Sequence, residues 1–315
     1  MRALVTRMRP DGRREKLLVH DWPDAPHPAG NQVRTRTLYS GITNGTERND
    51  LLGGNYATPD DRLPAGWGYQ NVGEVIECGP DCRRLAVGDV IYSSAGHDEF
   101  TTVAEDWLLV KLPPEIDRRE AALFGMASVA MHTCRNADLR MGERALVVGA
   151  GFIGQVAAQI AAAMGARVGI CDIDEQRLDK AREIGAADCA FNSGGDGWAA
   201  NVPSASFDAV IDLAGVPGME DRLIETAAMR GRVLLIAGRH KVEYTFNTGQ
   251  GREIVIKQNS HFDNGDLAML CGLVARGAVR IQPLLQRVAP VAEAAGIYDT
   301  LRDDPNQLGG TVFEW

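Results

Sequence analysis

The stretch that decides the fold is ALVVGAGFIGQVAAQIAAAMGARVGICDID, residues 145–174. An apolar strand-like run leads to three glycines in G-x-G-x-x-G spacing, Gly149, Gly151 and Gly154, which open an alanine-rich helical segment. In such a unit the first glycine permits a tight turn, the second lets the backbone approach a pyrophosphate, and the third lets the helix pack closely on the strand. The context predicts a dinucleotide-binding site, the alternative being a glycine-rich turn in an α/β fold that binds no nucleotide.

Asp172 indicates which dinucleotide is expected. It ends the second strand of the unit, where a carboxylate accepts hydrogen bonds from the ribose hydroxyls and repels a 2′-phosphate. The three residues that follow it are Ile173, Asp174 and Glu175, which offer no cation. We therefore expect NAD rather than NADP. Further cofactor contacts are expected at the start of the helix and at the ends of two later strands, from Phe152, Ile153, Ala214 and Ala237.

Strands and helices alternate through the middle of the chain, and most of the helices end at a glycine. This pattern is typical of βαβ units in a parallel sheet, so the expected fold class is α/β with a Rossmann-type doubly wound sheet. The expected strands are Ala145–Val148, Arg167–Cys171, a short one near Ala190, Ala209–Leu213, Val233–Ala237 and Glu253–Lys257, and the expected helices are Phe152–Met164, Glu175–Ile184, Gly218–Met229 and Asp266–Ala275.

The composition excludes several classes of function. A net charge of -9 argues against nucleic acid or an anionic membrane as a partner, because either needs a concentrated positive face. No uninterrupted apolar run of about 18 residues occurs, so we expect no membrane span. The start, MRALVTRMRPDGRR, has no apolar signal region, and the six cysteines follow no disulfide framework. A cytoplasmic protein with a small-molecule substrate is expected.

Several further stretches resemble the medium-chain dehydrogenase/reductase family along nearly the whole chain. They are SGITNGTE (Ser40–Glu47), GYQNVGEVIECG (Gly68–Gly79), VGDVIY (Val87–Tyr92), EFTTVAEDWLLVKLP and AALFGMASVAMHT. The resemblance implies a β-rich, GroES-like catalytic domain in two pieces, 1–117 and 281–315, around a nucleotide-binding domain at 118–280, in a homodimer or homotetramer. The SGI-x-x-GTE signature and the ending DDPNQLGGTVFEW resemble most the branch of bacteriochlorophyllide a dehydrogenase.

The sequence departs from the zinc-dependent branch of this family. The first ligand position of that branch falls at Thr43 or Asn44, the family's Gly-His-Glu reads Gly-Tyr-Gln with Tyr69 at the histidine, and the third position falls at Phe124. Zinc binds thiolate, imidazole or carboxylate, and none of these residues offers one. We therefore expect no catalytic metal.

Without a metal, a protein group must hold the substrate oxygen and handle its proton. Tyr69 is the first candidate, because it takes a ligand position and carries a phenol, although a core tyrosine is an equal alternative. His97 lies in a loop that borders the cleft in this family, and its imidazole could pass a proton to solvent. Thr43, Glu47 and Ser128 are the remaining candidates; Ser128 falls where relatives place a hydroxyl beside the nicotinamide.

These expectations describe a zinc-independent oxidoreductase that transfers a hydride between NAD(H) and a secondary alcohol or ketone. One alternative is a zinc-free quinone or enone reductase, which Asp172 disfavours because that branch usually uses NADPH. The other alternative is a protein that binds NAD(H) and has lost catalysis.

Overall fold

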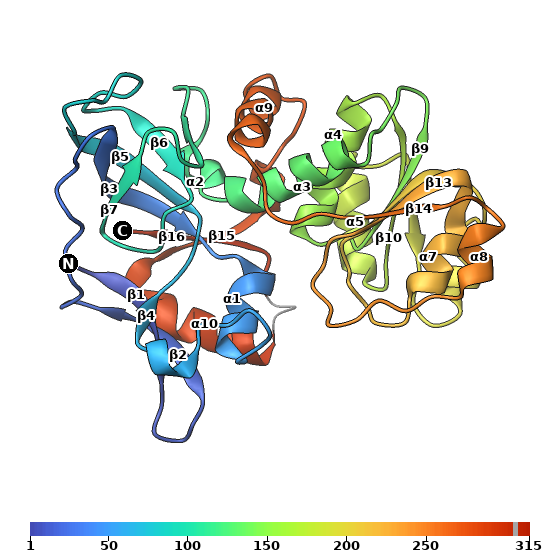
Figure 1. Cartoon of the computed structure of the whole chain (residues 1–315), viewed down its shortest axis with the longest axis horizontal. Helices are drawn as coiled ribbons and strands as arrows, with labels where there is room; N and C mark the ends of the chain where they lie inside the picture. Colours follow the sequence, from blue (N-terminus) through green and yellow to red (C-terminus); the bar gives the residue numbers. More distant parts are fainter. Residues whose placement is uncertain (305–307) are drawn as a thin grey trace. The chain divides into compact units, whose positions relative to one another are not determined.

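The chain forms two compact units in the computed structural model, which describes residues 1–304 and 308–315 (Figure 1). Unit 1 comprises Met1–Gly125 and Ile281–Trp315, and unit 2 comprises Met126–Arg280. Residues 118–125, which we placed in the nucleotide-binding domain from the sequence, therefore belong with unit 1. Residues 305–307 of the sequence ending quoted above lie outside the described residues.

Unit 2 contains a six-stranded sheet in which every pair of neighbouring strands is parallel. In spatial order the strands are β11 (Cys189–Asn192), β10 (Arg167–Asp172), β9 (Arg144–Val148), β12 (Phe207–Asp212), β13 (Ala227–Leu235) and β14 (Val255–Gln258). Taken in chain order this is 3-2-1-4-5-6, the order of a dinucleotide-binding doubly wound sheet. The α/β fold class expected from the sequence is confirmed.

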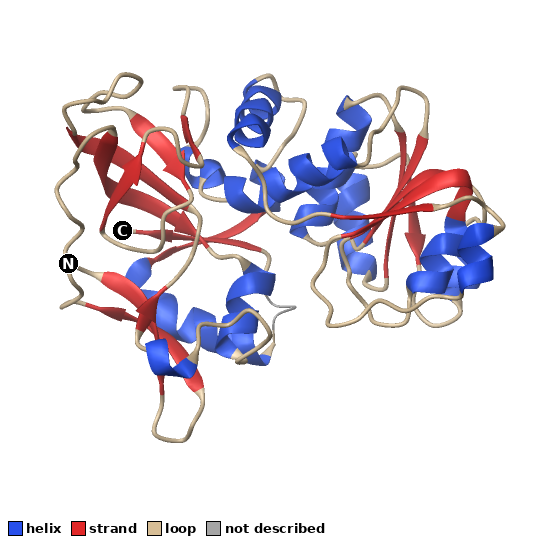
Figure 2. Cartoon of the chain, viewed as in Figure 1, coloured by secondary structure: helices blue, strands red, loops and turns tan. Residues whose placement is uncertain are grey.

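The helices of unit 2 lie on both sides of this sheet (Figure 2). They are α3 (Phe124–Asn136, whose first two residues belong to unit 1), α4 (Phe152–Ala163), α5 (Glu175–Glu183), α6 (Gly197–Asn201), α7 (Glu220–Thr226), α8 (Phe246–Gln250) and α9 (Asn264–Ala275). The helix expected at Gly218–Met229 is shorter than predicted, because β13 already begins at Ala227. There Ala227 pairs with Phe207 of β12 and is fully buried, so sheet pairing overrides the local helical pattern.

Unit 1 is built from two sheets. A three-stranded sheet has the order β2 (Arg14–Val19), β1 (Ala3–Met8) and β4 (Ala65–Gly66). A seven-stranded sheet has the order β15 (Leu285–Pro290), β16 (Gly310–Glu314), β3 (Gln32–Gly41), β5 (Asn71–Cys78), β6 (Val90–Ser93) and β8 (Leu109–Lys111), with β7 (Phe100–Ala104) paired to β3.

The helices of unit 1 include one that the sequence pattern did not predict. They are α1 (Asn44–Leu51), α2 (Arg118–Ala121) and α10 (Ala294–Asp303), with short 3-10 turns at Asp60–Arg62, Gln282–Leu284 and Val291–Glu293. Helix α1 has the sequence NGTERNDL, which is rich in poor helix formers. It buries Glu47, Asp50 and Leu51, so tertiary contacts rather than intrinsic propensity stabilise it.

One apolar core joins the beginning and the end of the chain within unit 1. Leu4 of β1, Ile42 before α1, Tyr298 of α10 and Phe313 of β16 all belong to it. Strand β16 also pairs antiparallel with β3, so the C-terminal segment completes the large sheet. This shared burial explains why residues 281–315 return to the first unit.

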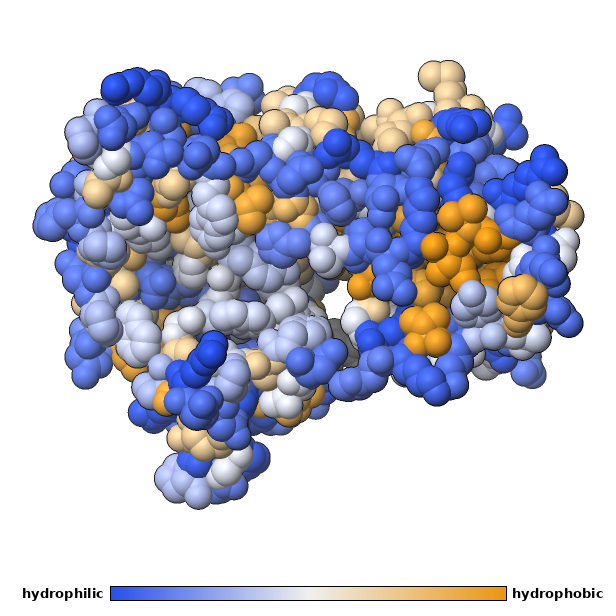
Figure 3. Space-filling view, viewed as in Figure 1, coloured by the Kyte–Doolittle hydropathy of each residue, from blue (hydrophilic) through white to orange (hydrophobic). Residues whose placement is uncertain are grey.

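Hydrophilic side chains cover most of the face drawn in Figure 3, and its broadest apolar patch lies on unit 2. Among the residues that the structure describes, no helix is both long and apolar enough to cross a membrane.

Candidate active site

The glycine-rich turn of unit 2 has the geometry that its spacing predicts. Gly149 follows β9 directly and has a φ of +98°, a conformation that side chains rarely adopt. A Cβ at Gly154 would lie 1.8 Å from the Gly149 carbonyl oxygen, whereas a Cβ at Gly151 would meet nothing within 4 Å. The turn is therefore tight on the side of the helix and open at Gly151, where a ligand's phosphates could approach the backbone.

The other expected cofactor residues of unit 2 lie at the carboxyl ends of its strands. Phe152 and Ile153 form the start of α4, and Gly151 caps this helix without any side chain over its first amides. Ala214 and Ala237 follow the ends of β12 and β13. Ligands of open parallel sheets bind at this edge. The structure thus brings the predicted cofactor residues to one edge of one sheet.

Asp172 ends β10 and turns its carboxylate toward the glycine-rich turn. Its Oδ2 accepts a hydrogen bond of 2.7 Å from the Ala150 amide, and its Oδ1 accepts one of 3.0 Å from the Asp174 amide. Arg177, one turn into α5, has Nη1 at 3.7 Å from Asp172 Oδ2. The sequence interpretation missed this cation because it considered only the next three residues. It lies five positions after Asp172, where the first turn of the helix brings it back.

Two threonine hydroxyls, those of Thr43 and Thr46, lie beside Tyr69 in unit 1. Burial raises the pKa of the Tyr69 phenol, and this effect exceeds the opposing one of its side-chain hydrogen bonds with Thr46 and Thr43. Thr43 precedes α1, and its hydroxyl accepts a hydrogen bond of 3.3 Å from the Gln70 side chain. The phenol therefore stays protonated at neutral pH and carries a proton that it can donate. Thr46, which the sequence interpretation did not single out, is part of this group.

Glu47 is a buried hub that four donors hold. Its carboxylate accepts hydrogen bonds from Lys16 Nζ at 2.7 Å, the Tyr298 hydroxyl at 2.6 Å and the Thr43 amide at 2.7 Å, and it lies 3.2 Å from His97 Nε2. The side chains of Lys16 and Glu47 are each 1% exposed. Burial would raise the pKa of Glu47, but the charges and hydrogen bonds of Lys16 and His97 outweigh it and lower the pKa. Glu47 is thus a fully engaged anion.

His97 differs in position from the solvent-facing loop residue that the sequence suggested. It is completely buried, and its Nε2 faces Glu47, while its ring lies edge-on to Phe313 with 6.3 Å between the ring centroids. A side chain without exposed surface cannot exchange a proton directly with solvent. We therefore correct the expected role, because packing places His97 among the groups that hold Glu47.

Ser128 lies in unit 2, on α3, and is fully buried. Its hydroxyl has no hydrogen-bond partner among the described residues. It therefore remains a candidate for a contact with a bound ligand.

Comparisons with known proteins agree with this architecture. Residues 153–264 match the zinc-binding dehydrogenase family. The "2-desacetyl-2-hydroxyethyl bacteriochlorophyllide A dehydrogenase" of Rhodobacter capsulatus is 26% identical over 307 residues, which are 91% of each chain. The crystal structure of 2R,3R-butanediol dehydrogenase from Bacillus subtilis superposes with a TM-score of 0.84 at 19% identity, covering 100% of both chains. A zinc-binding dehydrogenase from Sinorhizobium meliloti 1021, solved with NADP bound, covers 100% of this chain and 99% of its own, with a TM-score of 0.83 and 20% identity.

Over nearly its whole length the chain is thus similar to dehydrogenases that act on alcohol groups, and it resembles the medium-chain dehydrogenase/reductase family as its motifs predicted. A nicotinamide dinucleotide is the cofactor of such enzymes, which agrees with the glycine-rich site in unit 2. The family name also implies zinc, and the residues of this chain decide whether a zinc ion fits.

The residues at the family's ligand positions do not fit zinc. The Thr43 and Tyr69 side chains are hydrogen-bonded to each other. The Asn44 side chain donates to the Leu308 carbonyl at 2.8 Å, and Phe124 packs against Tyr92 with 6.0 Å between ring centroids. The buried carboxylate of Glu47, in helix α1, already accepts from four donors. In the described part of unit 1, no three His, Cys, Asp or Glu side chains come together as metal ligands.

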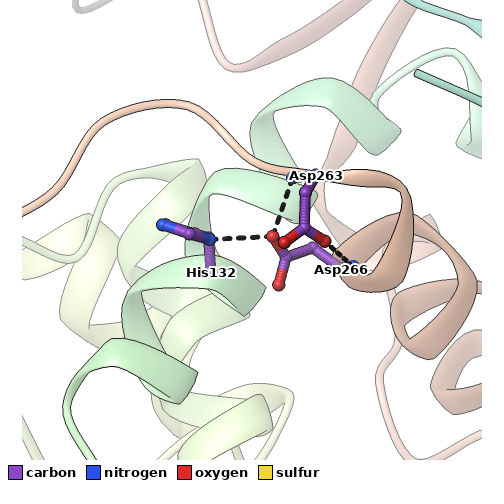
Figure 4. Close-up of side chains that lie close together, drawn as sticks. All are labelled: His132, Asp263 and Asp266. Atoms are coloured by element: carbon purple, nitrogen blue, oxygen red, sulfur yellow. Dashed lines mark hydrogen bonds and ion pairs between the residues drawn. The ribbon is translucent and has the colours of Figure 1, made fainter. Parts of the chain in front are cut away.

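One such trio occurs in unit 2, but protein groups already satisfy it. His132 of α3 and the acids Asp263 and Asp266 at the start of α9 converge there (Figure 4). Asp266 receives hydrogen bonds from the Asp263 amide at 2.8 Å and from Arg135 at 2.6 Å, and lies 2.8 Å from His132 Nδ1. Asp263 in turn caps α9 by accepting from the Asp266 amide. The trio is a helix cap with ion pairs.

Proposed function

We propose that this chain is a zinc-independent, NAD-linked dehydrogenase that interconverts a secondary alcohol and its ketone. The observation that carries the proposal is the cluster of three side-chain hydroxyls of Tyr69, Thr43 and Thr46. Two of its members, Tyr69 and Thr43, stand at sequence positions where the resemblance places ligands of the zinc branch. An alcohol dehydrogenase needs a group that holds the substrate oxygen as its charge changes. Here a protonated phenol is available for that task.

The proposed chemistry divides between the cofactor and Tyr69. When bound, the nicotinamide exchanges a hydride with the carbon that carries the oxygen. In the direction of reduction, the Tyr69 phenol donates a hydrogen bond to the carbonyl oxygen and gives up its proton as the alcohol forms. Oxidation is the reverse of this step: the Tyr69 phenolate takes the hydroxyl proton of the alcohol as the carbon gives its hydride to the cofactor. Burial favours the protonated phenol over the phenolate, so the donor role is the resting state.

We propose NAD as the preferred cofactor because Asp172 would face the ribose 2′-hydroxyl. A carboxylate there repels the 2′-phosphate of NADP. Arg177, at 3.7 Å from this carboxylate, weakens that repulsion by offering a positive charge. The preference is therefore expected to be clear but limited, about tenfold in dissociation constant, or about 1.4 kcal/mol.

The decisive experiment replaces Tyr69 by phenylalanine. The expected result is a drop in turnover of roughly a hundredfold or more, the range for losing one positioned acid–base group, with unchanged affinity for NADH. Tyr39→Phe is the matched control, since Tyr39 is another tyrosine of unit 1, on β3, whose hydroxyl donates to Glu314 at 3.4 Å. If Tyr69→Phe retains most of the activity on the substrate, Tyr69 is a packing residue and the proposed role fails.

A substrate screen separates this proposal from two other functions. A quinone or enone reductase would consume NADPH with conjugated carbonyls and would leave simple secondary alcohols untouched. A binding protein without catalysis would bind NADH and turn over no alcohol, ketone, enone or quinone. Oxidation of secondary alcohols with NAD as acceptor is the outcome that we expect.

We also propose that the protein works in the cytoplasm as a homodimer or homotetramer. All six cysteines are free thiols, which is typical of a reducing compartment. The oligomeric state follows the habit of the family, and light scattering of the purified protein tests it.

A further inference from the structure

An ion cluster lies at the carboxyl edge of the sheet in unit 2, and the dinucleotide motif does not account for it. Arg239, two residues after Ala237, has only 5% of its side chain exposed. Its Nη2 pairs with Asp212 at the end of β12, and its Nη1 lies 3.1 Å from Oε1 of Glu220, the first residue of α7. Asp212 and Glu220 are themselves 2% and 4% exposed. One buried arginine thus holds two buried acids.

Asp212 extends this cluster to the backbone that follows β12. Its Oδ1 accepts hydrogen bonds of 3.1 Å from the amides of both Ala214 and Gly215. Gly215 in turn lies against the next loop, since a Cβ there would be 2.5 Å from the Cβ of Ala237. Arg239 therefore fixes the shape of two adjoining loops, one after β12 and one after β13, which carry the expected cofactor contacts Ala214 and Ala237.

The place of these loops indicates which part of the cofactor they would meet. A dinucleotide lies across the point where the strand order reverses, here between β9 and β12, with its two halves on opposite sides. Asp172 on β10 serves the adenosine side. The loops after β12 and β13 consequently serve the nicotinamide side.

A buried cluster of this kind contributes more to geometry than to stability. Removing two charges and their counter-ion from water costs about as much as their attraction returns, so such clusters stabilise weakly compared with apolar packing. Removing the arginine alone leaves two buried carboxylates close together, which repel one another. The loops that Asp212 and Glu220 anchor would then lose their fixed arrangement.

We propose that Arg239 is a positioning residue for the nicotinamide side of the dinucleotide site. It acts through Asp212 and Glu220, which hold the loops after β12 and β13 in the shape that binds the cofactor. The proposal rests on the proposed binding of a nicotinamide dinucleotide, and it is independent of the role of Tyr69.

The test compares Arg239→Met with a matched control, Arg232→Met, on the strand that precedes Arg239. Arg232 lies in the second half of β13, where it pairs with Ala209 of β12. Its side chain is 14% exposed and pairs at 2.5 Å with Oε2 of Glu143, which precedes β9, at the opposite edge of the sheet from Arg239. Like Arg239, it has a buried Nε without a hydrogen-bond partner in the described chain. Both variants lose a largely buried ion pair of unit 2, but only one lies at the proposed cofactor edge.

NADH affinity is measured by fluorescence titration of the full-length variants, beside their thermal unfolding. We expect Arg239→Met to raise the dissociation constant for NADH about tenfold. This is the change expected if the two loops adopt the binding conformation in only about a tenth of the molecules. Arg232→Met should change it less than about twofold at a similar loss of stability. Equal weakening in both variants would reduce Arg239 to a structural residue, and normal binding by Arg239→Met would refute the proposal.

A second variant covers the case in which Arg239→Met does not fold. Arg239→Lys keeps the charge but lacks the planar fork that spans two carboxylates. We expect it to fold and to bind NADH with intermediate affinity, and affinity equal to that of the unaltered protein would refute the proposal. If the unaltered protein itself bound no NADH, the proposed function would fail, whereas binding that is indifferent to both Arg239 variants would remove only this inference.

Discussion

Replacing Glu47 by glutamine is the sharpest test of the hub in unit 1. Glutamine keeps the size of the side chain and removes its charge. The Lys16 ammonium, 1% exposed, would then lose the charge of its partner and be left with neutral acceptors such as the Trp67 carbonyl oxygen at 2.7 Å. The variant therefore isolates the cost of a buried cation without its counter-ion.

The size of the effect follows from this burial. Breaking a buried ion pair by removing one partner typically costs about 3–5 kcal/mol, a large part of the roughly 5–15 kcal/mol by which domains are stable. The double variant Lys16→Met with Glu47→Gln carries no unpaired charge. It should recover most of the loss, because the two substitutions act on one interaction and are not additive.

Urea unfolding at pH 7 measures the effect, and tryptophan fluorescence reports it well for unit 1. Four of the five tryptophans, at positions 22, 67, 107 and 315, belong to that unit. A loss below about 1 kcal/mol for Glu47→Gln would refute the reasoning, as that is the range of an exposed pair. A double variant no more stable than Glu47→Gln would also refute it.

The same pair predicts how stability depends on pH. Burial raises the pKa of Glu47, but Lys16 and His97 lower it by a larger amount, so the pKa in the folded state is below the ordinary value of 4.5. A depressed carboxyl pKa contributes stability that is fully present above the unfolded-state pKa and is lost as the pH falls through the folded-state pKa. The difference in unfolding free energy between the unaltered protein and Glu47→Gln should therefore be constant above about pH 5 and shrink in acid.

Two further predictions concern the cofactor and the metal. Asp172→Ser should narrow the preference for NADH over NADPH, because it removes the charge that repels a 2′-phosphate. Arg177→Gln should widen the preference, because it removes the charge that attracts the 2′-phosphate. Fluorescence titration with both cofactors measures the dissociation constants, and equal values in the unaltered protein would contradict the assignment. Elemental analysis should find well under one zinc per chain, and activity should survive chelators. The reason is that no side chain at the family's ligand positions offers zinc a thiolate, imidazole or carboxylate. Stoichiometric zinc with activity lost on chelation would overturn the proposed zinc independence.

The dinucleotide unit could be predicted from the sequence because its requirements are local. Gly149 needs a positive φ, Gly154 needs to pack against the backbone of the turn, and Asp172 needs to end the next strand. All three lie within one βαβ unit, where spacing along the chain fixes position in space. Arg177 was also within reach of the sequence, because one helical turn brings it back to Asp172.

The hub around Glu47 could not be predicted in this way. Its members Lys16, His97 and Tyr298 come from β2, a loop and α10, and the hydrogen bond between Tyr298 and Glu47 joins positions 251 residues apart. Nothing in the local sequence shows that these side chains are buried. The helix that carries Glu47 is itself weak in helical propensity and depends on the same core.

What the sequence by itself determined is therefore the backbone chemistry of the nucleotide turn and the parallel sheet around it. Only the tertiary structure decided which polar groups are buried together: it withdrew His97 from solvent, joined Tyr69 to two threonine hydroxyls, and set Arg239 between Asp212 and Glu220. The physical reason is that the charge state and role of a polar side chain depend on its burial and its partners, and both are set by contacts between segments distant in the chain.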